Sequence, residues 1–107
     1  IRDRQKAIED LTTGLPFAEE IKSLIAEFNA QKSQEALLSH DADQLELLLQ
    51  LKEHKDLGNR YADEWLRYNA KRLKTGVGRR LAEAILQTDF SAWWFKEEDE
   101  DWWVKGR

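Results

Sequence analysis

The side chains that could do chemistry in this chain are few, and four residues, His40-Asp41-Ala42-Asp43, bring several of them together. The chain has two histidines, His40 and His54, and no cysteine, so thiolate metal sites and cysteine nucleophiles are excluded. One imidazole and two carboxylates within four residues are side-chain types that ligate a divalent cation. The run is therefore the first candidate for a functional site.

The order His40-Asp41 resembles the paired His-Asp of metal phosphohydrolases. Those sites need further histidines and a later aspartate, and a chain of 107 residues with two histidines is too short and too poor in histidine to supply them. We therefore interpret the run as a helix N-terminus, where acidic side chains stabilise the positive end of the helix dipole. His54 is interpreted as a core or register-setting residue. We expect no enzyme, no metal site and no cofactor.

A second cluster is basic and surrounds Gly76 and Gly78. Its five cations are Lys71, Arg72, Lys74, Arg79 and Arg80. A helix that begins at the glycines would point free N–H groups outward, and such groups with cations beside them bind phosphate. The alternative is a joint between helices, in which Gly76 ends one helix and the cations balance helix ends or the acidic tail. We favour the joint, because Gly-x-Gly beside basic residues is a weak signal.

Three aromatic residues, Tyr61, Trp65 and Tyr68, share a helix face with Arg72. Aromatic side chains interleaved with arginine are typical of proteins that bind single-stranded nucleic acid by base stacking. The same three residues continue a leucine repeat, however, and this continuity favours packing in a core or between helices. We therefore expect them to bind a partner chain or a second copy.

The C-terminal end carries four of the five tryptophans, as the pairs Trp93-Trp94 and Trp102-Trp103 around an acidic stretch at 97–101. On one helix an offset of nine residues is half a turn out of phase, so a single straight helix over both pairs is not expected. Exposed aromatic surface of this size predicts a contact segment. Its acidic residues could also cover the basic cluster of the same chain.

The elements that must position these residues are predicted to be helices, because apolar residues recur at helical spacing. A first helix is predicted over 1–12. A second, with an apolar stripe that begins at Phe17, is predicted from Pro16 to about Leu38. Ser39 or Asp41 would then cap a third helix.

The third helix shows a coiled-coil repeat. Its seam positions alternate in steps of four and three, at Leu47, Leu51, His54, Gly58, Tyr61, Trp65, Tyr68 and Arg72. Gly58 could end a helix, but the repeat stays in phase across it, which favours one helix over 42–74. A last helix is predicted from Gly78, with Leu81 and Ile85 facing inward.

Charge is sorted into blocks along the chain, although the net charge is only −4. Residues 60–80 hold seven basic and two acidic side chains, and the segments on both sides are acidic. The negative net charge argues against a protein that binds polyanions in general, whereas the basic segment 60–80 permits a local anion site. No apolar run is long enough for a membrane span or a signal peptide, so we expect an intracellular, cytoplasmic protein without membrane contact.

These observations predict an all-α fold, a three- or four-helix bundle or a long-helix hairpin with a Trp-rich acidic C-terminal segment. The domain would cover 1–95, and the docking tail 96–107. The predicted function is a non-enzymatic protein–protein interaction and assembly domain, oligomeric through the heptad seam, with a protein partner or itself. The alternative is a nucleic-acid-associated module that binds phosphates through residues 60–80.

Overall fold

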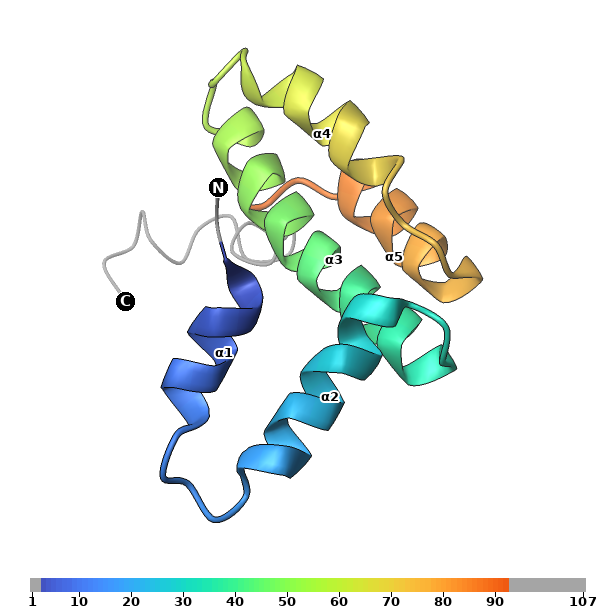
Figure 1. Cartoon of the computed structure of the whole chain (residues 1–107). Coiled ribbons are helices and arrows are strands. Elements are labelled where there is room, and N and C mark those ends of the chain that lie inside the picture. The colour runs from blue at the N-terminus through green and yellow to red at the C-terminus, as the bar shows by residue number, and fades with distance from the viewer. Residues whose placement is uncertain (1–2, 93–107) are drawn as a thin grey trace, which may run out of the picture. The chain divides into compact units, whose positions relative to one another are not determined.

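The computed structural model describes residues 3–92, and in this range the chain is helical and has no strand (Figure 1). The helices are α1 (Arg4–Thr12), α2 (Ala18–Ala30), α3 (Gln34–Asp56), α4 (Ala62–Ala70) and α5 (Gly76–Gln87). The predicted all-α class is therefore confirmed, and the bundle form stays a prediction. None of the described helices is both long and apolar enough to cross a membrane.

The chain divides into two compact units, residues 1–40 and 41–107, and α3 continues from the first unit into the second. The predicted boundary between a domain over 1–95 and a tail over 96–107 lies outside the described residues and stays a prediction. Each unit is described below by itself.

The first unit contains α1, α2 and the first two turns of α3. Asp3 caps α1, because its carboxylate accepts a hydrogen bond from Lys6 N at 3.0 Å. The chain then reverses between residues 13 and 17, so that α1 and α2 run in opposite directions (Figure 1). Helix α2 ends at Gln31, which has a left-handed backbone with φ of 52°.

The second helix is therefore shorter than predicted, and the third begins earlier. The prediction placed the end of the second helix near Leu38. Instead the chain turns at Gln31, and Ser33 caps α3 by accepting a hydrogen bond from Ala36 N at 3.1 Å. Because Ser33 fills this role, Ser39 and Asp41 lie within α3, and the predicted cap at either residue is wrong.

The second unit has a small core between the rest of α3, α4, α5 and the link before α5. Its buried residues are Leu48, Leu66, Leu73 and Ala82, and the partly buried residues packed on them are Leu45, Leu51, Ala70 and Ile85. In α5 the buried residues are Gly78 and Ala82. Ile85 packs on the core as predicted, whereas Leu81 is half exposed, so its predicted inward position is wrong.

The predicted continuous helix over 42–74 is wrong, because the chain breaks at Gly58. This glycine has φ of +100°, a conformation that L side chains rarely adopt. Asn59 N donates to His54 O at 3.0 Å, and Gly58 N donates to Lys55 O at 2.9 Å. These two bonds form a Schellman motif, which satisfies the last carbonyls of α3 and outweighs the in-phase apolar repeat.

Because the helix breaks at Gly58, the predicted seam residues of α4 lie outside the core. In α4 the buried residues are Ala62, Leu66 and Asn69. The seam residues of α4 and its N-cap are exposed instead, and so is His54, which is therefore not the predicted core residue. The aromatic residues consequently form an open face and are not part of the core found among residues 3–92.

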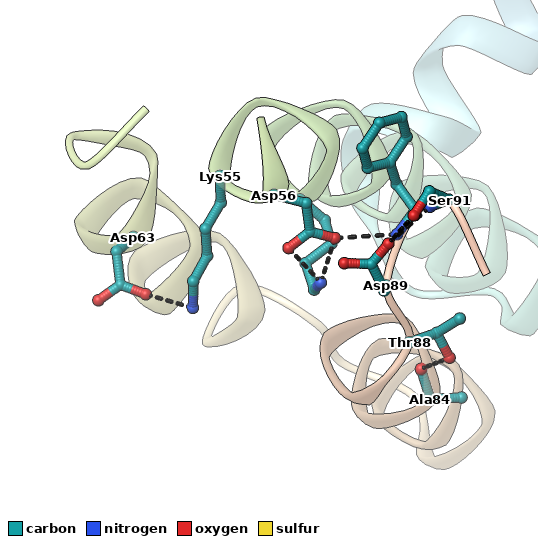
Figure 2. Close-up of polar contacts among 9 residues, drawn as sticks. Lys55, Asp56, Asp63, Ala84, Thr88, Asp89 and Ser91 are labelled. Carbon is teal, nitrogen blue, oxygen red and sulfur yellow. Dashed lines mark hydrogen bonds and ion pairs between the residues drawn. The ribbon is translucent and has the colours of Figure 1, made fainter. Parts of the chain in front are cut away.

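Polar contacts fasten the segments around the C-terminal end of α3 (Figure 2). Lys52 Nζ donates to both oxygens of Asp56, at 2.7 and 2.5 Å, and both side chains are about nine-tenths buried. Asp56 Oδ2 also accepts a hydrogen bond from Phe90 N at 2.9 Å, which ties the segment after α5 to α3. Lys55 reaches Asp63 of α4 at 2.7 Å.

Candidate functional site

Asp41, in the run from His40 to Asp43, is buried inside the second unit with 2% of its surface exposed. Its Oδ1 accepts a hydrogen bond from Lys74 N at 2.9 Å. Its Oδ2 accepts from Thr75 N at 2.8 Å and from Thr75 Oγ1 at 2.5 Å. Thr75 in turn caps α5, because its Oγ1 accepts from Gly78 N at 3.0 Å. One carboxylate thus fastens the start of α5 to α3, and we call Asp41, Lys74, Thr75 and Gly78 the Asp41 corner.

The charge of Asp41 suits this position. Burial alone would raise the pKa of the Asp41 carboxyl, but the hydrogen bond from the Thr75 side chain, those from the Lys74 and Thr75 N–H groups, and the charge of Arg79 together hold it below its usual value. A negative charge at the N-terminus of α5 also complements the helix dipole. Asp41 was predicted to stabilise the N-terminus of the third helix. In the structure it lies instead at the N-terminus of α5.

Gly78 is required by the close approach of the Asp41 carboxylate. A Cβ atom on Gly78 would overlap Asp41 Oδ2 and would lie 3.0 Å from both Asp41 Cγ and Thr75 Oγ1. Any side chain at this position must therefore displace the buried carboxylate. The backbone of α5 and the side chain of Asp41 fit each other only with glycine at position 78.

His40, in the first unit, is engaged with Phe28 of α2. The two rings stack with centroids 4.0 Å apart and an angle of 12° between their planes. His40 Nε2 lies 3.1 Å from Phe28 O, a geometry in which the protonated nitrogen donates to the carbonyl. This contact leaves only Nδ1 of the imidazole for another partner.

Asp43 differs from its two neighbours. It lies on α3 two residues after Asp41 and is exposed, and its carboxylate has no hydrogen bond or ion pair with any residue between 3 and 92. Of the three metal-ligating side chains in the run, Asp43 is therefore the one whose oxygens are all available.

The described residues do not make a metal site by themselves. Within residues 3–92 no group of three or more His, Cys, Asp or Glu side chains is placed to hold a metal ion. Both oxygens of Asp41 are already bonded to N–H and O–H donors, and His40 keeps one free nitrogen. A metal bound here would need ligands beyond those that this part of the chain supplies.

The predicted partner-binding residues of α4 lie together on its open face. Tyr61, the N-cap of α4, is 68% exposed, Trp65 66% and Tyr68 61%. Trp65 and Tyr68 line a groove of 450 Å³ with Leu47 and Leu51 of α3, and we call this the α4 groove. The predicted contact residues Trp93, Trp94, Trp102 and Trp103 lie outside the described residues, and their role stays a prediction.

The five predicted phosphate-binding cations have separate contacts. Lys71 Nζ lies 5.6 Å from the centre of the Tyr68 ring, Arg72 lines the α4 groove, and Arg80 Nη1 approaches Gly76. Arg79 acts on Asp41 through its charge, and Lys74 gives its backbone N–H to the same carboxylate. Among the N–H groups at this helix start, those of Lys74 and Thr75 donate to Asp41 and that of Gly78 donates to Thr75. Phosphate binding by the cations stays a prediction.

Sequence reasoning missed the role of Asp41, since its partners are 33 and 34 residues away. It also missed Asn69, which is buried in the second unit. One local signal was present: Thr75 stands three residues before Gly78, the spacing at which a threonine caps a helix. That signal indicates where α5 begins but not which carboxylate binds there.

Comparison with known proteins identifies the family. The sequence pattern of the HD domain matches residues 2–85, which is most of the chain, and the chain belongs to the HD domain family. No curated protein and no solved structure matches the chain. The HD domain is helical, in agreement with the five helices described here.

Family membership corrects the predicted function. HD domains form a family of metal-dependent phosphohydrolases, so the expectation of a chain without enzymatic activity is wrong. The predicted assembly domain and its nucleic-acid-binding alternative are overturned by the same finding. The inference failed because it took a shortage of histidines within one short chain as evidence against the whole class.

Proposed function

We propose that this chain serves in metal-dependent hydrolysis of a phosphate ester. The observation that supports the proposal is the match of the HD domain to residues 2–85. The described residues alone do not complete a metal site, so the active site requires further ligands beside them. The chain's own contribution is a set of helices and a carboxylate, that of Asp43, without a described partner.

Asp43 is the residue of the His40–Asp43 run that we assign to the site. A metal ligand needs a lone pair that no other group occupies. Asp41 has its two oxygens bonded in the corner, whereas the Asp43 carboxylate has no partner among the described residues. On this assignment Asp41 stabilises the fold and Asp43 is a metal ligand.

The test measures the release of p-nitrophenolate, the leaving group of both esters used, by the natural polypeptide that contains this sequence. The protein is stripped of metal and supplied with Mg²⁺, Mn²⁺, Co²⁺ or Zn²⁺, with p-nitrophenyl phosphate as monoester and bis(p-nitrophenyl) phosphate as diester. We expect hydrolysis that depends on added metal and is abolished by EDTA. Failure to hydrolyse either ester with any of the four metals contradicts the proposal.

Variants test the assignment of Asp43. Asp43→Asn should lower kcat by about 100-fold or more, since even residues that only support a ligand cost 10–100-fold. Glu53→Gln is the matched control, because Glu53 is also exposed on α3 and its carboxylate has no described partner. Its activity should stay within about twofold of the parent. Equal activity of the two variants contradicts the role of Asp43.

A further inference from the structure

Helix α4 has one face buried and one face open, and the open face is aromatic. Tyr61, Trp65 and Tyr68 recur at steps of four and three, so they lie on one side of the helix. Each of them is more than 60% exposed, while Leu66 on the opposite side is 2% exposed. Leaving three large aromatic side chains in water forgoes about 1.5–3 kcal/mol for each that could be buried. Such a face is typical of a surface that another protein covers.

The α4 groove beside this face contains polar groups that lack partners. Glu64 and Arg72 both line it, and neither side chain has an ion pair with a described residue. Asn69, which also lines it, is 4% exposed, and its Nδ2 donates to Gln44 O at 2.9 Å. This bond orients the amide, and Asn69 Oδ1 is left buried without a hydrogen bond. Because this oxygen is already enclosed by the chain's own atoms, the polar groups of the groove that a partner can reach are Glu64 and Arg72.

The two groove charges are self-complementary. Glu64 lies in the first turn of α4, and Arg72 lies in the turn that directly follows the end of α4 at Ala70, so the two charges stand at opposite ends of the helix. If a second copy lies antiparallel on the first with the twofold axis beside Tyr68, Arg72 of the partner subunit stands opposite Glu64, and the reverse pair forms at the other end. This is the isologous arrangement that a twofold dimer requires.

We propose that the α4 groove is the interface of a homodimer in which two α4 helices pack antiparallel. The aromatic faces supply the buried area, and the two Glu64–Arg72 pairs fix the register and direction. The proposal concerns assembly and does not depend on the proposed hydrolysis.

The area that this face offers is sufficient for a small dimer. An aromatic side chain buries 150–250 Å², and about two-thirds of that range from six such side chains comes to roughly 600–1,000 Å². Leu47, Leu51 and the charged rim of the groove add to this. The total reaches the approximately 1,000 Å² above which specific interfaces begin.

The experiment measures the mass of the whole chain by sedimentation equilibrium between about 1 μM and 0.5 mM, which covers micromolar to submillimolar dissociation constants. Glu64→Arg and Arg72→Glu should each raise the dissociation constant of the dimer at least about tenfold, because each variant places two like charges opposite one another at both ends of the interface. The double variant exchanges the two charges, and its dissociation constant should lie within about threefold of that of the parent. Glu83→Arg, at an exposed position of α5 without a described partner, is the control and should change nothing.

Two further measurements complete the test. Trp65→Ala should abolish the dimer while the circular dichroism of the monomer stays unchanged, since Trp65 is 66% exposed and not part of the core. A chain that remains monomeric at about 0.5 mM overturns the proposal, whether the groove then takes residues 93–107 or another protein. A dimer that is insensitive to both charge reversals also overturns it, because a different surface must then form the contact.

Discussion

At the scale of single residues, Asp41 shows how a carboxylate near a histidine can serve structure. It lies 33 and 34 residues from Lys74 and Thr75, and its two oxygens accept three hydrogen bonds from them. Hydrogen bonds to a charged group contribute about 1.5–3 kcal/mol each, and a buried donor left unpaired costs about as much. The carboxylate is therefore a main support of the second unit.

Replacing Asp41 should destabilise the fold with a defined pH dependence. Asp41→Ala should lower the free energy of unfolding by about 3 kcal/mol near neutral pH. Because the pKa of Asp41 is lowered in the folded state from 3.8, its contribution is complete above that value and is lost as the pH falls through the folded pKa. The difference between parent and variant should therefore shrink in acid, measured by urea unfolding from pH 7 downwards.

Asp43→Asn is the control for this measurement, since Asp43 is exposed two residues away on the same helix. It should change the free energy of unfolding by no more than about 0.5 kcal/mol at any pH. A difference between parent and Asp41→Ala that stays constant down to the acid transition would show that the charge of Asp41 plays no part.

Gly78→Ala should be destabilising although it lies inside a helix. Alanine gains about 1 kcal/mol over glycine in a helix interior, but here its Cβ would displace the Asp41 carboxylate. We expect a net loss of about 2 kcal/mol, because the three hydrogen bonds of the corner are strained or broken. Thermal unfolding by circular dichroism measures the loss.

Gly76→Ala is the matched comparison, since its Cβ would meet only Arg80 Nη1, at an ordinary 3.5 Å. This variant should be neutral or slightly stabilising. If the two alanine variants are equally stable, the close fit at Gly78 is not important for folding.

At the scale of elements, the periodic apolar pattern predicted where helices occur better than where they end. Helix α1 lies within the predicted 1–12, and α5 begins two residues before the predicted start. The ends of α2 and α3 depend on Gln31, Ser33 and Gly58, whose backbone angles and caps override the apolar repeat. An apolar repeat that stays in phase across a glycine does not predict whether the φ angle of that glycine is positive or negative.

Gly58→Ala tests the break between α3 and α4. No atom lies within 4 Å of the added Cβ, so the cost comes from the backbone at φ of +100° alone. We expect a loss of about 1 kcal/mol, within the cost of a left-handed conformation for an L residue. Chemical denaturation checks it, and an unchanged or increased stability would indicate that α3 and α4 join into one helix in the variant.

At the scale of the whole molecule, the class of fold followed from the sequence and the class of protein did not. Helical spacing and the lack of strand signals were sufficient for an all-α prediction. The roles of the site residues could not be predicted from the sequence, because His40, Asp41 and Asp43 lie within four residues and yet have three different environments. Only the contacts of each side chain distinguish a carboxylate that supports the fold from one that is free.

The exposed seam also shows that residue spacing predicts which side chains share a face but not whether that face is buried. Its spacing correctly indicated that Trp65 and Tyr68 share a face, and Leu47 and Leu51 lie beside them in the groove. Spacing alone could not show that the face is open, because the break at Gly58 turns Leu66 of α4 toward the core and leaves the aromatic residues outside. The same residues would have been a core in an unbroken helix.

The Asp41 corner also has a consequence for the order of folding. The contact between Asp41 and Thr75 closes a loop of 34 residues, and closing such a loop costs about 3 kcal/mol of chain entropy before the hydrogen bonds return anything. Helix α4 lies within that loop, so docking α4 on α3 first shortens the distance that the chain must search. We therefore expect the corner to form late in folding and to open early in unfolding, so that α5 is released while α3 and α4 are still paired.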